Sequence, residues 1–182
     1  MPRLRLQEGN LSVEAVRPAD IEPIRRWRNA QLKVLRQVAP ISPGEQTAYY
    51  RKHVWPDLRS PNPGNILLTY LENGRRIGYG GLVHIAWDHR RAEVSFLLKT
   101  DLAGTLDECS RYFPIFLGLM KTLAFGDLRL NRLSTETYAI RERHIAALEK
   151  TGFRREGVLR EHVWIDNRPV DSIMHGCLSS YP

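Results

Sequence analysis

Three apolar, β-prone stretches follow one another between residues 66 and 98, and this succession most constrains the fold. Ile66–Leu71 ends at Asn73-Gly74, Ile77–Trp87 ends at Asp88-His89, and Ala92–Leu98 completes the series. Asn-Gly is the strongest short signal for a tight hairpin turn, because both central residues need a positive φ. The pattern predicts three consecutive antiparallel strands, a β-meander.

The rest of the chain alternates helical and strand patterns around this meander. Helices are expected from Pro18 and over residues 43–53, 112–125 and 141–151, and strands over residues 11–16, 133–138, 153–165 and 170–178. Ser42-Pro43-Gly44-Glu45 has the form of a capping box, and Gly152 suits a helix end. The order β-α-α-β-β-β-α-β-α-β-β predicts an α+β protein with helices layered on a central sheet.

Loop signals do not divide the chain into domains. Residues 56–64 hold three prolines, but neither flank of this loop could close a core alone. A chain of 182 residues is the size of one domain, and we expect a single domain over residues 1–182.

Charge and composition narrow the functional classes. The chain has 27 Lys+Arg against 20 Asp+Glu, a formal charge of +7, which favours a polyanionic partner. The basic residues are dispersed and match no nucleic-acid motif, so a nucleic-acid binder is disfavoured. Cys109 and Cys177 have no metal-ligand spacing, and the histidines have none either, so no metal site is expected.

Targeting and membrane signals are missing from the sequence pattern. The amino-terminal residues lack the apolar stretch of a signal peptide, and the most apolar run, Phe113–Met120, is too short to cross a bilayer. We therefore expect a cytoplasmic protein that does not insert into membranes.

Three strings resemble the GNAT superfamily of acyl-CoA-dependent N-acyltransferases, and the element order agrees with it. The most specific runs from Arg143 to Arg160 and is similar to the fourth helix and sixth strand of the RimJ/RimL-like branch and its amino-sugar N-acetyltransferase relatives. Trp27-Arg28-Asn29 and Ala92–Leu98 match weaker motifs of the first helix and fourth strand. The resemblance implies a mixed, mostly antiparallel sheet of about seven strands, splayed in the middle, with about four helices.

The same resemblance implies acetyl-CoA as cosubstrate and assigns residues to it. Backbone groups of Phe96, Leu97 and Leu98 would bond the pantetheine arm, and the helix that starts near Tyr112 would face the pyrophosphate, with help from Ser110 and Arg111. Arg141 stands where the family has an asparagine beside the pantetheine.

The chain departs from the family pattern at the phosphate loop. The stretch Asp107–Pro114 contains no glycine where the family has a glycine-rich loop, so arginine would replace part of the missing backbone contacts. Leu148 stands where many members have a tyrosine as general acid.

Acyl transfer needs a base for the amine and an acid for the leaving thiolate. Glu93 is the first candidate base, with an exposed strand glutamate paired to Arg90 or Arg91 as the alternative. Glu136 is the second candidate base. Tyr138 and His144 are the candidate acids.

The acceptor side is assigned from the resemblance and from residue chemistry. Arg28 and Asn29 could approach a nucleotide-sugar diphosphate, Trp87 could stack on a ring, and His162 could line a polar pocket. The favoured hypothesis is acetyl transfer to a small polar amine, with a nucleotide-linked amino sugar as the favoured acceptor. The alternatives are a protein N-terminus as acceptor, a GNAT-like binding module without catalysis, and a nucleic-acid binder. A homodimer is also possible.

Overall fold

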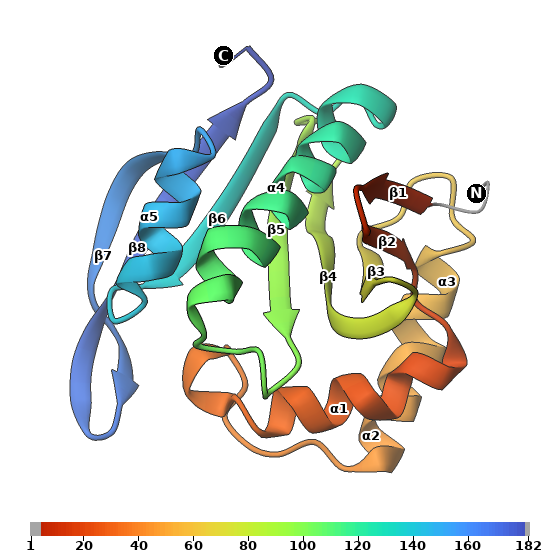
Figure 1. The fold of residues 1–182 in the computed structure, drawn as a ribbon, viewed down its shortest axis with the longest axis horizontal. Coiled ribbons are helices and arrows are strands. Elements are labelled where there is room, and N and C mark those ends of the chain that lie inside the picture. The colour runs from red at the N-terminus through yellow and green to blue at the C-terminus, as the bar shows by residue number, and fades with distance from the viewer. Residues whose placement is uncertain (1–4, 181–182) are drawn as a thin grey trace.

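The computed structural model describes residues 5–180, and its centre is one eight-stranded sheet. The strands are β1 Arg5–Glu8, β2 Leu11–Ala15, β3 Ile66–Glu72, β4 Arg75–Ala86, β5 Arg91–Leu98, β6 Arg132–Tyr138, β7 Arg154–Ile165 and β8 Arg168–Leu178. Their order across the sheet is β1-β2-β3-β4-β5-β6-β8-β7. The mixed, mostly antiparallel architecture expected from the sequence is confirmed, with β3, β4 and β5 forming the meander (Figure 1).

The parallel pair β5–β6 is the point where the sheet opens. These strands are paired at three positions, Arg91 with Arg132, Ala92 with Leu133 and Glu93 with Ser134. Strand β6 then continues to Tyr138 along β8, while β5 continues to Leu98 along β4. The two strands diverge over these residues, which is the splayed middle that the family resemblance implies.

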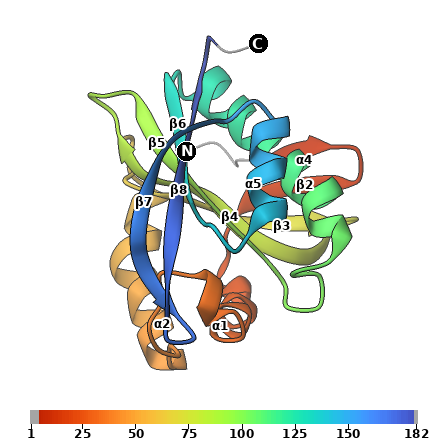
Figure 2. The same cartoon turned by 90° about the vertical axis from the view of Figure 1, so that its left-hand side faces the viewer.

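Helices cover both faces of the sheet (Figure 2). The α-helical segments are α1 Ile21–Asn29, α2 Pro43–Tyr49, α3 Trp55–Asp57, α4 Phe113–Lys121 and α5 Glu142–Lys150. Short 3-10 or π turns occupy Pro18–Asp20, Leu32–Val34, Tyr50–Val54, Glu108–Tyr112 and Thr122–Asp127. Among the helices of residues 5–180, none combines the length and apolarity needed to cross a membrane.

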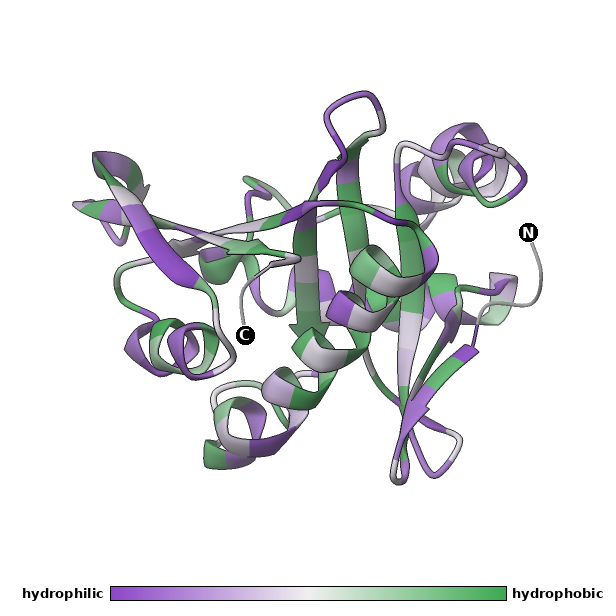
Figure 3. Ribbon diagram, turned by 90° about the horizontal axis from the view of Figure 1, so that it is seen from above, coloured by the Kyte–Doolittle hydropathy of each residue, from purple (hydrophilic) through white to green (hydrophobic). Residues whose placement is uncertain are grey.

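Each sheet face has its own hydrophobic cluster, because side chains alternate along a strand. Leu68, Tyr70 and Leu98 pack with α4 and α5 in the larger cluster, where Phe116 and Leu117 are fully buried. Leu67, Tyr79 and Leu97 pack on the other face with Ile24 of α1 and with Tyr50 and Val54. In Figure 3 hydrophobic residues gather at the centre of the molecule, and hydrophilic ones prevail at the periphery.

Several expected boundaries were wrong for physical reasons. Strand β1 was missed because its residues are mostly exposed and polar, so they lack the alternation of a half-buried strand. The helix expected to end at His53 continues past Pro56 to Asp57. A π turn, Tyr50–Val54, precedes this proline, which is the second residue of α3. The predicted capping box at Ser42 and Glu45 is confirmed, with bonds in both directions.

Candidate active site

Two carboxylates flank the start of the opening between β5 and β6, on the face covered by α1 and α2. Glu93 is the last residue of β5 that pairs with β6. Glu136 lies two residues beyond Ser134, the last residue of β6 that pairs with β5. Neither sits free: Nη2 of Arg36 lies 2.8 Å from Oε1 of Glu93 and 2.6 Å from Oε2 of Glu136. The alternative partners of Glu93, Arg90 and Arg91, are not the ones observed, since Arg90 donates instead to the Arg129 carbonyl.

A cavity of about 700 Å³ opens beside these groups. Its walls come from the segment after α1, from β6 and from the β7–β8 hairpin; the members that carry charge or a hydroxyl are Lys33, Arg36, Glu136, Tyr138, His162 and Asp166. Nε2 of His162 lies 3.6 Å from Oε1 of Glu136. Burial, followed by the nearby Glu136, raises the pKa of Tyr138, so its hydroxyl stays protonated at neutral pH. We call this space the acceptor cavity.

A second cavity of about 690 Å³ lies at the carboxyl ends of the diverging strands. It is walled by Asn29–Val34, by Ala103–Thr105 with Glu108 and Cys109, and by Ile140–His144. Lys33, Arg141 and Arg143 bring positive charge to it, which suits a polyanionic ligand. Leu32 and Lys33 line both cavities, so the segment after α1 separates the two. We call the second space the cosubstrate cavity, after the ligand that the sequence leads us to expect there.

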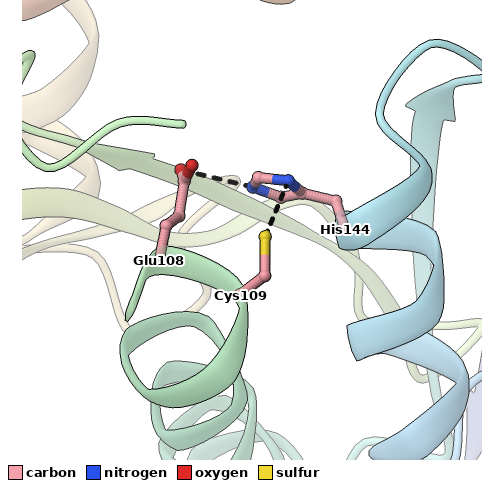
Figure 4. A group of neighbouring side chains, drawn as sticks. All are labelled: Glu108, Cys109 and His144. Carbon is pink, nitrogen blue, oxygen red and sulfur yellow. Dashed lines mark hydrogen bonds and ion pairs between the residues drawn. The ribbon is translucent and has the colours of Figure 1, made fainter. Parts of the chain in front are cut away.

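A hydrogen-bonded network of Glu108, Cys109, Arg141 and His144 forms one wall of the cosubstrate cavity. Figure 4 shows Glu108, Cys109 and His144 of this network. The Glu108 carboxylate accepts the Gly104 N–H at 2.6 Å and lies 3.3 Å from Nε2 of His144. Nη2 of Arg141 lies 2.6 Å from the same nitrogen. Because arginine can only donate and a carboxylate can only accept, Nε2 bonds one of the two at a time, and Nδ1 lies 3.3 Å from Sγ of Cys109.

Burial sets the charge state of this network. It lowers the pKa of His144, against the contact with Glu108, so the imidazole is neutral at neutral pH. Burial alone would raise the pKa of Glu108, but the contacts with His144, the Gly104 N–H and Arg141 together lower it. Burial also raises the pKa of Cys109.

The side chains of Glu108, Cys109 and His144 have ligand atoms within 4.8 Å of one another, a separation that could hold a metal ion. Cys109 faces Nδ1 and Glu108 faces Nε2, so no one nitrogen is directed at both. The Arg141 guanidinium adds a fixed positive charge at Nε2. The arrangement is that of a hydrogen-bond network, and the expectation of no metal stays a prediction.

The residues predicted to hold pyrophosphate lie away from the cosubstrate cavity. Arg111 bonds Glu72 at 2.6 Å, and the Tyr112 hydroxyl bonds the same carboxylate at 3.2 Å. Ser110 donates to the Leu106 carbonyl within its own helix. The helical turn over Glu108–Tyr112 explains the difference, because these backbone N–H groups belong to a helix and not to a loop. Of the predicted cosubstrate side chains, Arg141 lines the cavity.

The predicted pantetheine strand is partly covered. On the α4 side, the Phe113 ring stacks on Phe96 at 4.7 Å and contacts the His144 ring at 5.0 Å. The side-chain amide of Gln31 donates to the Leu98 carbonyl at 2.8 Å. Leu97 packs in the cluster under α1.

Three of the residues predicted to bind the acceptor form hydrogen bonds within the protein. Asn29 holds the segment after α1 through bonds in both directions with Ile41. The Trp87 indole donates to the Pro63 carbonyl, outside both cavities. Arg28 bonds Gln37 and the Tyr79 hydroxyl. His162 lines the acceptor cavity, and its role in binding an acceptor stays a prediction.

Sequence reasoning missed Arg36, Glu108 and Gln31, all of which contact predicted site residues. Arg36 lies in a stretch without periodicity, and its partners are 57 and 100 positions away. A buried glutamate can be found from sequence only when its partners are known. No local pattern could have identified these contacts.

Comparison with known proteins agrees with this fold. A family model described as "Acetyltransferase (GNAT) domain" matches residues 13–174. Among solved structures, spermidine N-acetyltransferase from Vibrio cholerae in complex with CoA and spermine superposes with a TM-score of 0.82 at 20% identity, covering 94% of this chain and 96% of that one. A dodecameric form of the Vibrio cholerae enzyme gives a TM-score of 0.79 at 20% identity, covering 94% and 95%.

At this identity the structural likeness shows a shared fold. A search of curated protein sequences gave no significant match. The family model spans most of the chain and carries the assignment. The chain therefore belongs to the GNAT acetyltransferase family and is an N-acetyltransferase with acetyl-CoA as its cosubstrate.

Proposed function

We propose that this enzyme transfers the acetyl group of acetyl-CoA to the amine of a small cationic acceptor bound in the acceptor cavity. The observation that carries the proposal is the guanidinium of Arg36, which lies within 2.8 Å of Glu93 and 2.6 Å of Glu136. Two carboxylates that hold a cation of the chain can hold an ammonium group in the same way. Spermine in the related Vibrio cholerae structure is an amine of this class.

The reaction suggests a role for Glu136 and Tyr138, which line the acceptor cavity, and for Glu93, which Arg36 links to it. An ammonium has no lone pair, so it must lose a proton before it attacks the thioester. Glu93, at the start of the opening, is the proposed base, and Glu136 the proposed anchor for positive charge. Tyr138 is the proposed acid for the departing thiolate, because its raised pKa keeps the proton available.

The geometry gives less support to a nucleotide-linked amino sugar. A diphosphate needs uncommitted cations, and the two cations that line the acceptor cavity, Arg36 and Lys33, are engaged by Glu136 and Asp166. Of the other groups suggested for such a substrate, Trp87 and Asn29 hold loops, and Arg28 lines a separate cavity of about 80 Å³, too small for a sugar. A protein N-terminus remains compatible with the acceptor cavity and is tested alongside. A cytoplasmic location and a homodimer stay predictions.

The test is an acetyl-CoA turnover assay that follows free thiol release over a panel of acceptors. The panel contains aliphatic diamines and polyamines, nucleotide-linked amino sugars and short peptides. Turnover with the aliphatic amines supports the proposal. Turnover confined to amino sugars or to peptides contradicts it, and so does a lack of turnover with every acceptor when calorimetry shows that CoA binds.

A further inference from the structure

A small cavity of about 80 Å³ lies under α1 and α2, and its lining includes Val83, the cross-strand partner of Glu93. Its polar lining consists of Arg28, Gln46, Tyr49, Tyr50, Tyr79 and Ser95. A cavity of this size holds several water molecules or one carboxylate, and excludes a sugar or a nucleobase.

Tyr50 supplies an unsatisfied donor to this cavity. Its side chain is 2% exposed, and its hydroxyl has no hydrogen-bond partner among residues 5–180. Burial raises the pKa of Tyr50, so the hydroxyl keeps its proton. A buried hydroxyl without a partner is costly, and an acceptor atom in the cavity would relieve that cost.

Arg28 supplies a positive charge with no negative partner. Its Nη1 donates to the Tyr79 hydroxyl and its Nε to Gln37, both at 2.9 Å. Both partners are neutral, and across the described part of the chain no carboxylate pairs with this guanidinium. A guanidinium has five N–H donors, so further donors remain for an anion.

The cavity is a direct neighbour of the proposed base. Val83 lines it and is the cross-strand partner of Glu93, and Ser95 lines it two residues beyond Glu93 on β5. Residues two apart on a strand are separated by about 6.6 Å and point to the same face. A group bound at Ser95 and Arg28 would therefore lie one such step from the amine at Glu93.

We propose that the acceptor carries a carboxylate as well as its amine, and that Arg28, Tyr50 and Ser95 bind this carboxylate. The inference rests on the proposed function, since it places the amine at Glu93. The spacing fits an amino acid whose reacting amine is at the far end of its side chain, about four or five carbons from the carboxylate. An isolated diamine would leave Arg28 and Tyr50 unsatisfied.

The experiment compares amines that differ in the carboxylate alone: lysine with cadaverine, and ornithine with putrescine. The measured quantity is the ratio of kcat/KM for the amino acid to that for its decarboxylated counterpart. We expect a ratio of about 10 to 100, the effect of one charge-assisted hydrogen-bonded contact. Arg28→Gln should reduce the ratio about 10-fold or more, and Tyr50→Phe about fivefold.

Arg26→Gln is the matched control, because Arg26 is an exposed arginine of the same helix that pairs with Glu22. Arg26→Gln should give the same ratio of kcat/KM values as the unchanged protein. Tyr50→Phe guards against misfolding of the Arg28 variant, since the hydroxyl it removes makes no bond within the described chain. A ratio of one or less in the unchanged protein, or a ratio that survives both variants, overturns the inference.

Calorimetry of lysine binding in the presence of CoA distinguishes a failure of the carboxylate site from a failure of the proposed function. If cadaverine is acetylated and lysine gains nothing from Arg28, the carboxylate site is refuted and the proposed function stands. If no amine is acetylated but lysine binds in an Arg28-dependent way, the site stands and the proposed function is refuted. If lysine neither reacts nor binds, the carboxylate site is refuted.

Discussion

Nη2 of Arg36 lies 2.6 Å from Oε2 of Glu136, and this contact joins the segment after α1 to the open part of β6. The same nitrogen reaches Glu93 on β5, so one cation bridges both sides of the opening. Burial opposes the charge, but the two carboxylates together raise the pKa of Arg36. The cation therefore occupies the place where a positively charged acceptor would be bound.

Replacement of Arg36 by glutamine should strengthen binding of a cationic amine. The variant removes a cation of the chain that competes for Glu93 and Glu136. Because the Arg36 side chain is half exposed, the competing contact contributes about 1 kcal/mol, which corresponds to a KM about fivefold lower. Steady-state kinetics at low ionic strength measure this change, with Arg26→Gln as the control. A higher KM would show instead that Arg36 helps to bind the acceptor.

Glu93→Gln and Glu136→Gln should have different kinetic effects. Loss of a general base costs about 10²-fold or more in kcat, and the loss should shrink at higher pH, where the amine is already neutral. Glu136→Gln should mainly raise KM, since that residue is the proposed anchor. The readout is kcat and KM as functions of pH for both variants. Equal losses of kcat with unchanged KM in both variants would contradict this division of roles.

The elements that the sequence predicted correctly are those with a local signal. The meander from Ile66 to Leu98 has alternating apolar residues and an Asn-Gly turn, and α4 has its apolar stripe, so period and turn chemistry were sufficient. Strand β1 has neither signal: three of its four residues are exposed, and it is held by pairing with β2. Its existence depends on the sheet edge that it joins.

The site was less predictable because its geometry is made by contacts distant in sequence. Alternation placed Glu93 and Glu136 on strands beside the opening, but nothing local indicated that Arg36 would bridge them. Arg111 precedes a helical stripe and was expected to face phosphate, yet Glu72 at the end of β3 pairs with it. A charged residue is directed by the nearest opposite charge in the folded chain, and sequence spacing does not reveal that partner.

Cys109 should react with iodoacetamide before Cys177 does, and CoA should protect it. Cys109 is partly exposed in the cosubstrate cavity, whereas Cys177 is 1% exposed in the core. The raised pKa of Cys109 keeps the thiolate fraction low, so its alkylation should be slower than that of a free thiol at the same pH. Peptide mass spectrometry over time measures both sites, and Cys109→Ser confirms the assignment. Equal rates with and without saturating CoA would contradict a CoA site in this cavity.

Acidification should destabilise the fold through its buried histidines. His175 is 0% exposed, and burial lowers its pKa despite the neighbouring Glu149. Between the ordinary value of 6.5 and the lower folded pKa, the unfolded chain binds more protons than the folded one. Its contribution to stability is therefore fully present above that ordinary value and is lost as the pH falls through the folded pKa.

Urea unfolding at about pH 7.5 and about pH 5.5 measures this dependence. His175→Gln should reduce the difference in the free energy of unfolding between the two conditions. A part of the difference should remain, because burial lowers the pKa of His144 in the same direction. A difference that is as large in the variant as in the unchanged protein would show that other groups cause the pH dependence.

Gly81→Ala should destabilise the sheet at the small cavity under α1 and α2, which is lined by Leu67 and Ser95, the cross-strand partners of Gly81. Gly81 has a φ of +142°, which a side chain disfavours, and a Cβ there would lie 1.9 Å from the Ile66 carbonyl oxygen. That oxygen belongs to the backbone of β3, which is paired with β4 and cannot retreat without loss of register. We expect the free energy of unfolding to fall by about 3 kcal/mol or more, measured by urea denaturation. Gly126→Ala is the control, because a Cβ at Gly126 meets nothing within 4 Å, and a similar loss there would contradict the steric explanation.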